Sequence, residues 1–292
     1  MKRTASALTL LLAASSAIAL GRPIRFERLS TEQGLSQSTV MSLLQDSKGF
    51  MWFGTEAGLN RYDGRTVTVY RHDVHDQNSL PSDFVWSLAE DAAGDLWVAT
   101  EGGGLARWER ANDRFVRYPV DPKGEKGPGS GQLRTVHVDR RGSVWVGTKD
   151  AGLSRLDPKT GVWQTFRNDP ENAASLVNDG VYALYEDAAG TLWVGTNGGL
   201  SQFDATAGGF KNQSHDPRNP GSLSDDRIRD LHEDRQGRLW VATFGGGLDS
   251  RAKGSEAFEH RRHDAKNPRS LADDFVRSEE HTSELQSPDH LV

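Results

Sequence analysis

Short apolar stretches, each bounded by polar turn residues, recur along the chain at a nearly constant interval. Each stretch contains a tryptophan, and successive tryptophans are about 47 residues apart. These are Trp52, Trp97, Trp145, Trp193 and Trp240. An interval kept over five copies indicates one structural unit repeated in tandem, because the residues of a single catalytic motif do not recur in this way.

Every copy has the same order of turn and strand signals. An aspartate is followed three residues later by a glycine, which is typical of a tight turn, as with Asp91 and Gly94. β-branched and aromatic residues come next, then a turn containing glycine and another short apolar run. Further strand-like runs lie before the aspartate and at the end of the copy. In the second copy we expect strands at 85–88, 96–100, 104–108 and 115–118.

Four antiparallel strands in about 47 residues are the blade of a β-propeller. No segment between Leu35 and Val276 shows the 3.6-residue period of a helix, which excludes a helical solenoid. The sequence therefore predicts an all-β propeller of four-stranded antiparallel blades. Five blades and the start of a sixth would form an incomplete ring. The tryptophans should pack between blades, where burying one indole contributes at most about 5 kcal/mol.

The connections between blades also repeat, and we expect these loops at one mouth of the ring. They occupy 72–80, 168–176, 215–223 and 263–271, and the third blade has 121–133 instead. Three of these loops begin with His-Asp, at His72, His215 and His263, and one begins with Asn168. Repetition spreads the histidines around the ring, so they are not expected to converge on one metal. Side chains that stabilise the loop turns are the predicted role.

The repeat breaks off after the last linker. Residues 270–276 match 79–85, as the start of a sixth blade would, but no turn aspartate, glycine or tryptophan follows. Segment 277–287 resembles the translation of a short-read sequencing adapter. We therefore expect the propeller at 20–276, a non-native tail at 277–292, and a chain that is a fragment of a longer protein. A natural polar tail is the alternative.

The beginning of the chain has the features of a secretory signal peptide. Lys2 and Arg3 are followed by a small, apolar run, and Ala17 and Ala19 have the spacing of a cleavage site. The run is shorter than the ~20 residues of a spanning helix. We expect a signal peptide at 1–19, with an uncleaved anchor as the alternative.

Composition excludes several kinds of function. The net charge is −6 and no block of Lys or Arg stands out, so nucleic acid is not an expected partner. The chain has no cysteine, which rules out disulfides, zinc–thiolate sites and a cysteine nucleophile. The glycine runs 102–104 and 245–247 lie between strands, where no helix follows to bind phosphate. We expect no catalytic residue, metal or cofactor in this chain.

Side chains that differ between blades are the candidates for ligand contact. The position directly after each tryptophan-containing strand is the one that varies in chemistry, whereas the strand itself hardly changes. Ordinary turn residues are the alternative interpretation. The candidates are Glu56, Glu101, Lys149, Asn197 and Phe244.

The repeated residues resemble the two-component regulator propeller repeat of large bacterial sensor proteins. The resemblance rests on the phrase D-x-x-G-x-L-W-V-G-T-x-x-G-L and on the N-x-x-S-L linker, and it covers about residues 26–276. It implies periplasmic propellers of about seven blades, followed by a membrane helix and a cytoplasmic output domain, most often a histidine kinase. The implied ligand is a small molecule, often a carbohydrate, and a homodimer is left open.

The function expected from this resemblance is periplasmic ligand sensing within a transmembrane signalling protein. The output could also be a diguanylate cyclase. A secreted propeller enzyme, such as a lyase or hydrolase, or a binding scaffold is the alternative from another class. The downstream sequence discriminates between them. In either case, the last blade should leave one apolar face uncovered.

Overall fold

The computed structural model describes residues 28–277. The predicted signal peptide at 1–19 lies outside these residues, as does the predicted tail from residue 278 onward. The strands form five separate four-stranded antiparallel sheets, which are the predicted blades. A short 3₁₀ helix, η1 (Thr31–Gln33), precedes the first blade. No helix within 28–277 is long and apolar enough to cross a membrane.

The blades follow one another in sequence. Blade 1 contains β1 (Val40–Gln45), β2 (Met51–Thr55), β3 (Gly58–Tyr62) and β4 (Val67–Tyr70). Blade 2 contains β5 (Val85–Glu90), β6 (Leu96–Thr100), β7 (Gly104–Glu109) and β8 (Arg114–Tyr118). Blade 3 contains β9 (Leu133–Val138), β10 (Val144–Thr148), β11 (Leu153–Asp157) and β12 (Val162–Phe166). Blade 4 contains β13 (Val181–Glu186), β14 (Leu192–Thr196), β15 (Leu200–Asp204) and β16 (Gly209–Gln213). Blade 5 contains β17 (Ile228–Glu233), β18 (Leu239–Thr243), β19 (Leu248–Arg251) and β20 (Glu259–Arg261).

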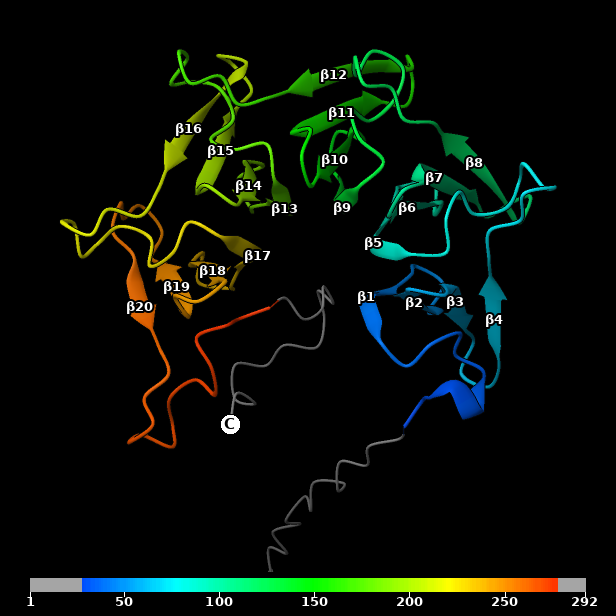
Figure 1. The fold of residues 1–292 in the computed structure, drawn as a ribbon, viewed down its shortest axis with the longest axis horizontal. Coiled ribbons are helices and arrows are strands. Elements are labelled where there is room, and N and C mark those ends of the chain that lie inside the picture. The colour runs from blue at the N-terminus through cyan, green and yellow to red at the C-terminus, as the bar shows by residue number, and fades with distance from the viewer. Residues whose placement is uncertain (1–27, 278–292) are drawn as a thin grey trace, which may run out of the picture.

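The blades are arranged around a common axis, with the first strand of each innermost and the fourth at the periphery (Figure 1). The prediction of an all-β propeller with four-stranded blades is confirmed. Most predicted strands are off by one or two residues at an end; for instance, β5 continues to Glu90. The repeat predicted a fourth strand in every blade, and β16 provides it in blade 4 although Phe210 is the only large apolar residue of that short segment.

The turn at the start of each tryptophan-containing strand is held by its aspartate. One carboxylate oxygen of Asp139 accepts the backbone N–H groups of Arg141 and Ser143, at 3.0 and 2.8 Å. The other oxygen accepts the indole N–H of Trp145 at 2.9 Å. The remaining four copies make the same three bonds. The spacing from aspartate to tryptophan is therefore fixed by this contact as well as by the turn.

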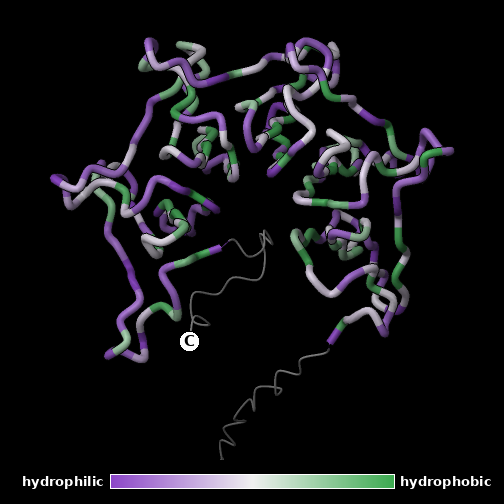
Figure 2. The backbone as a smooth tube through the Cα atoms, viewed as in Figure 1, coloured by the Kyte–Doolittle hydropathy of each residue, from purple (hydrophilic) through white to green (hydrophobic). Residues whose placement is uncertain are grey.

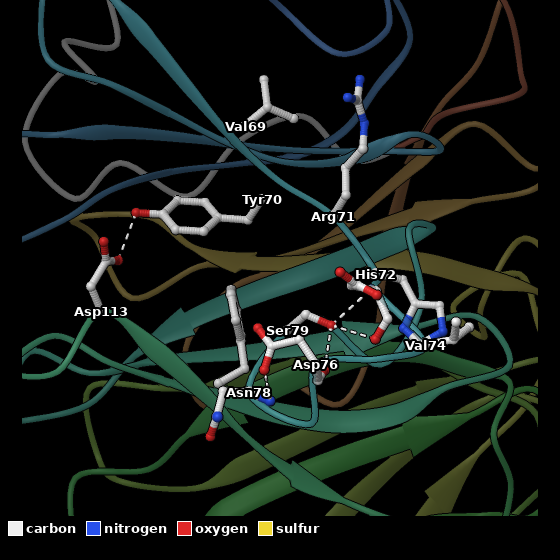
Figure 3. Close-up of a pocket in the computed structure, with 11 residues that line it drawn as sticks. Val69, Tyr70, Arg71, His72, Val74, Asp76, Asn78, Ser79 and Asp113 are labelled. Carbon is white, nitrogen blue, oxygen red and sulfur yellow. Dashed lines mark hydrogen bonds between the residues drawn. The ribbon is translucent and has the colours of Figure 1, made fainter.

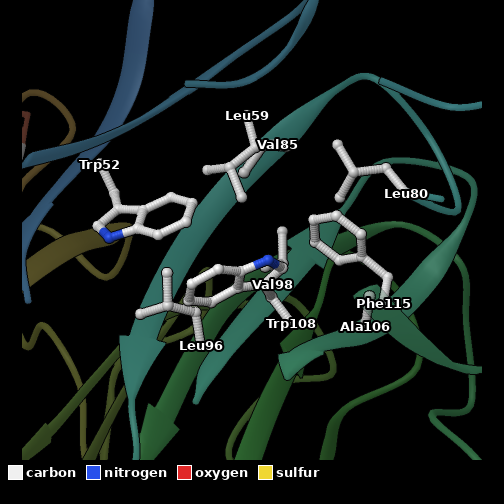
Figure 4. Close-up of a cluster of buried hydrophobic side chains, with 9 residues drawn as sticks. All are labelled: Trp52, Leu59, Leu80, Val85, Leu96, Val98, Ala106, Trp108 and Phe115. Atoms are coloured by element: carbon white, nitrogen blue, oxygen red, sulfur yellow. The ribbon is translucent and has the colours of Figure 1, made fainter. Parts of the chain in front are cut away.

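Four apolar clusters join the five blades in consecutive pairs. In the first, Trp52 of blade 1 packs on Trp108 of blade 2, with ring centroids 4.7 Å apart (Figure 4). Each of the first four repeat tryptophans is buried against the following blade in this way, as predicted. Figure 2 shows apolar positions concentrated within the blades and hydrophilic ones in the peripheral linkers.

Trp240 of blade 5 is only half-buried and belongs to none of these four clusters. Figure 1 shows the arc open between blade 5 and blade 1. The linker that follows blade 5 is nevertheless built like the earlier ones, with a parallel bridge between His263 and Leu271 matching that between His72 and Leu80. Within residues 28–277 the prediction of five blades and the start of a sixth is therefore confirmed.

The histidines of the linkers are structural, as predicted. Nδ1 of His72 lies 2.7 Å from the carbonyl oxygen of Leu80, and His215 and His263 make the equivalent contact. In the linker after blade 3, Nδ2 of Asn168 donates to the carbonyl of Leu176 at 2.8 Å. Histidine and asparagine are interchangeable here because each places an N–H at the same carbonyl.

Candidate ligand site at the mouth of the ring

One end of every blade carries both the linkers and the hairpin between its second and third strands. The backbone N–H of Gly58 in the first hairpin donates to the carbonyl of Asp83 in the following linker at 2.8 Å. Blades 3, 4 and 5 make the same bond, from Gly152 to Asp179, Gly199 to Asp226 and Gly247 to Asp274. We call this end of the blades, near the ring axis, the mouth, and the opposite end with the aspartate turns the turn end.

All five innermost strands are irregular at their second residue. In β5, for example, Val85 pairs with Thr100 and Ser87 with Ala99, so one residue is left without a partner in β6. This is a β-bulge, which redirects the side chain of the extra residue. The five bulge residues are Met41, Trp86, Arg134, Tyr182 and Arg229.

The strand facing each bulge has a small residue, glycine or alanine. A Cβ on Gly147 would lie 2.6 Å from Cγ2 of Thr135 and 2.6 Å from Cγ1 of Val181 in the next blade. A Cβ on Gly195 would lie 2.5 Å from Cγ2 of Ile228. The glycine in the repeated phrase therefore allows neighbouring innermost strands to approach closely beside the bulge.

The sequence-predicted site residues lie directly beside these bulges. The backbone N–H of Glu101 donates to the carbonyl of Phe84, just before β5, at 2.9 Å. Lys149, Asn197 and Phe244 make the equivalent bond in blades 3, 4 and 5. The preceding threonine closes the hairpin, since its hydroxyl donates to a glycine carbonyl, as from Thr100 to Gly104 at 2.7 Å. Four of the five predicted positions thus share one backbone frame near the ring axis.

Glu101 is the centre of one side-chain cluster. Its carboxylate accepts the indole N–H of Trp86 at 2.7 Å and forms an ion pair with Arg134, whose guanidinium lies 4.5 Å from the centre of the Trp86 ring. Burial alone would raise the pKa of Glu101, but the bonds from Arg134 and Trp86 and the charge of Lys149 outweigh it and lower the pKa. Glu101 therefore stays ionised at neutral pH.

Asn197 and Phe244 meet at a second cluster around Arg229. Nη1 of Arg229 donates to Oδ1 of Asn197 at 3.0 Å. The guanidinium lies 4.4 Å from the centre of the Tyr182 ring and 4.7 Å from that of Phe244. Glu56, in contrast, is exposed and accepts a bond from Gln37 at 3.2 Å. The structure therefore brings Asn197 and Phe244 together and leaves Glu56 apart.

The bulge residues themselves were missed from the sequence. Each follows the first apolar residue of an innermost strand, where simple alternation gives no reason to expect an extra residue. The available signal was their variety, because Met41, Trp86, Arg134, Tyr182 and Arg229 differ in chemistry at one aligned position.

Two grooves on the surface of residues 28–277 lie away from the predicted positions. The larger, of about 610 Å³, is at the periphery between blades 1 and 2 and is lined by residues such as Tyr70, His72 and Asp113 (Figure 3). Its polar groups bond to one another: the Tyr70 hydroxyl donates to Asp113 at 2.9 Å, and Ser79 bonds the linker backbone. The smaller groove is at the turn end of blades 4 and 5. Neither includes a predicted site residue.

An aspartate–histidine pair in blade 5 is not arranged for catalysis. Nδ1 of His260 lies 2.7 Å from Oδ1 of the fully buried Asp249, but Nε2 lies 2.9 Å from the carbonyl of Pro220 and is thereby occupied. Within residues 28–277 no group of three or more histidine, aspartate or glutamate side chains is placed to hold a metal.

Four segments of the repeat match the model of a known family. The model of the two-component regulator propeller matches residues 34–57, 79–102, 175–198 and 222–245. Each of these segments contains the first two strands of a blade and the aspartate turn between them, in blades 1, 2, 4 and 5.

The chain carries two-component regulator propeller repeats.

Solved structures with a similar fold include extracellular domains of two putative hybrid two-component systems from B. thetaiotaomicron. The first has a TM-score of 0.54 and 22% identity over 86% of this chain and 38% of that chain. The second has a TM-score of 0.57 and 22% identity over 83% of this chain and 36% of that one. A surface component of the type IX secretion system of Porphyromonas gingivalis has a TM-score of 0.63, at 16% identity over 82% of this chain and 35% of that chain. At these identities the likeness concerns the fold.

A sequence relative is a histidine kinase of Formosa agariphila, designated P4, which is 42% identical over 55 residues. That match covers 19% of this chain and 4% of the kinase. The chain therefore spans a small part of that relative and less than two-fifths of each of the three structures named above.

Proposed function

We propose that this chain is the ligand-sensing propeller of a transmembrane signalling protein, located in the periplasm, with a histidine kinase as its output. The observation that carries the proposal is the mouth. There, one repeated backbone frame presents a different bulge residue from each blade, and two clusters of charged and aromatic side chains form beside the predicted positions. Such variation on a rigid scaffold is typical of binding surfaces.

The chemistry of the mouth favours binding over catalysis. Arg134 and Glu101 neutralise each other, and the aromatic rings of Trp86, Tyr182 and Phe244 lie under guanidinium groups. Planar aromatic and charged groups of this kind suit a polar small molecule, including a carbohydrate. The similarity to extracellular domains of hybrid two-component systems supports the location and the signalling role.

The genomic locus provides the first test. The proposal expects an uninterrupted reading frame beyond residue 276 that encodes further blades, a membrane helix and a kinase or other output domain. A stop codon soon after the remaining blades would contradict it and favour a secreted enzyme or scaffold. A frame that encodes residues 277–292 as they stand and then continues would refute the non-native tail and leave the sensor proposal intact.

Ligand sensing is tested on the signalling protein encoded at that locus. Candidate oligosaccharides that raise the melting temperature of this propeller should also change the phosphorylation of the output domain. Phe244→Ala removes one ring of the mouth, so it should reduce both responses. Ligands that bind but leave phosphorylation unchanged would contradict a sensing role.

A further inference from the structure

Two arginines occupy equivalent positions in the mouth. Arg134 is the bulge residue of β9 and Arg229 that of β17. Nη1 of each donates to the carbonyl of the residue before it, at 3.0 Å for Leu133 and 2.9 Å for Ile228. Arg134 also pairs with Glu101 and stacks on the bulge residue Trp86, both in the preceding blade 2. Arg229 likewise bonds Asn197 and stacks on the bulge residue Tyr182, both in the preceding blade 4.

The bonding partners of the two arginines differ in charge. Arg134 is paired with the carboxylate of Glu101, whereas Arg229 bonds the neutral amide of Asn197. Glutamate and asparagine lie at the same aligned position, so the same geometry gives one compensated and one uncompensated guanidinium. Arg134 acts within the molecule as an internal control for Arg229.

The charged groups around Arg229 do not supply the missing negative charge. Asp225 contributes a charge interaction with Arg229 but no hydrogen bond to it. Both carboxylate oxygens of Asp225 instead accept bonds from Arg227, at 2.9 and 2.6 Å. Arg227 and Arg277 add further positive charge in the surroundings. Tyr182 and Phe244, whose rings contact the guanidinium, have no carboxylate to offer it.

A half-buried guanidinium without a counter-charge is unfavourable, and burial lowers the pKa of Arg229 below its usual value. An anion that pairs with it relieves this penalty. Nη1 is already used by Asn197 and Ile228, so an anion would approach the Nε and Nη2 side, whose fork matches a planar carboxylate.

We propose that Arg229 is the anion-binding residue of the mouth and that the ligand carries a carboxylate. This deepens the proposed function, because it assigns a ligand class to the same site. Asn197 acts as a positioning residue that orients Arg229 and leaves its charge available. The Tyr182 and Phe244 rings hold the guanidinium plane in place.

The test is calorimetric titration of the 292-residue chain with D-glucuronate and, as its uncharged match, D-glucose, at constant ionic strength. The wild-type chain should bind glucuronate at least about tenfold more tightly than glucose. Asn197→Glu gives Arg229 the partner that Arg134 has, so it should reduce glucuronate affinity at least about tenfold. Arg229→Gln should do the same.

Gln164→Glu is the matched control, because it adds the same charge on the exposed face of β12 at the periphery. It should leave affinity within about twofold. Melting curves show whether each variant is folded. If Asn197→Glu does not fold, the glucuronate affinity of Arg229→Gln alone decides the test. Equal binding of glucuronate and glucose, or undiminished glucuronate affinity in both mouth variants, would overturn the proposal. A neutral sugar that binds and signals while glucuronate does neither would overturn it but leave the sensing function standing.

Discussion

The turn end and the mouth of the blades use repetition in opposite ways. At the turn end all five blades make the same bonds, in which one aspartate accepts two backbone N–H groups and an indole N–H. At the mouth the backbone also repeats, down to the bulge, but the side chains differ from blade to blade. The comparison suggests that stability rests on the uniform end and recognition on the varied end.

Contacts between blades strengthen this contrast. At the turn end a glutamate of one blade accepts the backbone N–H of the preceding turn, as from Ser47 to Glu90 at 2.8 Å and from Ala188 to Glu233 at 2.6 Å. Arg110 of blade 2 reaches back to Asp46 at 2.8 Å. The turn end thus also links neighbouring blades through repeated polar contacts.

The largest effect on stability is expected from Asp139→Ala. The substitution removes three hydrogen bonds and leaves the indole N–H of the buried Trp145 without its acceptor. We expect a loss of about 2–4 kcal/mol in the free energy of unfolding, measured by urea denaturation. Asp150→Ala, at an exposed position in the same blade, is the control. Equal losses in both variants would show that the turn bonds are not what stabilises the blade.

Gly147→Ala should have the next largest effect, because it places a Cβ where Thr135 and Val181 leave no room. Overpacking at this point should destabilise the chain by about 1–3 kcal/mol, again measured by urea denaturation. Blades 2 and 5 already have alanine at the aligned positions Ala99 and Ala242. Ala99→Gly is therefore a control that should cost less, and a larger loss in Ala99→Gly than in Gly147→Ala would contradict the close-approach argument.

A smaller loss of stability is expected when the Asp46 carboxylate is protonated at acid pH. Burial would raise the pKa of Asp46, but bonds from Trp52, Arg110 and two backbone amides outweigh it, so the pKa lies below the usual 3.8. Since the folded pKa is lowered, the stabilisation is fully present above about pH 5 and is lost as pH falls through the folded value. Denaturation midpoints measured from pH 7 to pH 3 should fall less steeply in Asp46→Ala than in the wild-type chain. The same slope in both would rule out this carboxylate as a source of acid sensitivity.

Glu101→Gln keeps an acceptor for Trp86 but removes the counter-charge of the largely buried Arg134, so it should lower the free energy of unfolding by about 1–3 kcal/mol. It also affects binding: Arg134 becomes uncompensated like Arg229. Glucuronate titration should then give a second binding event, absent from the wild-type chain. Unchanged stoichiometry would weaken the argument from the two arginines.

Much of the fold could be predicted because the repeat aligns equivalent residues. Five copies of the aspartate, glycine and tryptophan pattern were enough to predict blades, turns and the burial of the first four tryptophans. The bond between Asp139 and the Trp145 indole could not be predicted, since spacing alone does not distinguish a turn residue from one that also accepts a side-chain bond. The bounds of β16 could not be predicted, because pairing with β15, and not its own composition, makes it a strand.

The candidate site was predicted only in part. The positions of Glu101, Asn197 and Phe244 followed from the repeat, but their partners lie in innermost strands that are distant in sequence. A bulge adds a residue without changing composition, so Trp86, Tyr182 and Arg229 appeared as ordinary strand residues. The charge difference between the two arginine sites depends on which residues meet across blades, and only the structure provides that.

Ligand-induced stabilisation is the most direct test of whether stability depends on the turn end and recognition on the mouth. The measurement is the shift in melting temperature caused by glucuronate in the wild-type chain, in Asn197→Glu and in Asp139→Ala. We predict that Asp139→Ala melts at a lower temperature but keeps the shift, whereas Asn197→Glu melts close to wild type and loses it. A shift that is kept in Asn197→Glu and lost in Asp139→Ala would contradict the assignment of recognition to the mouth.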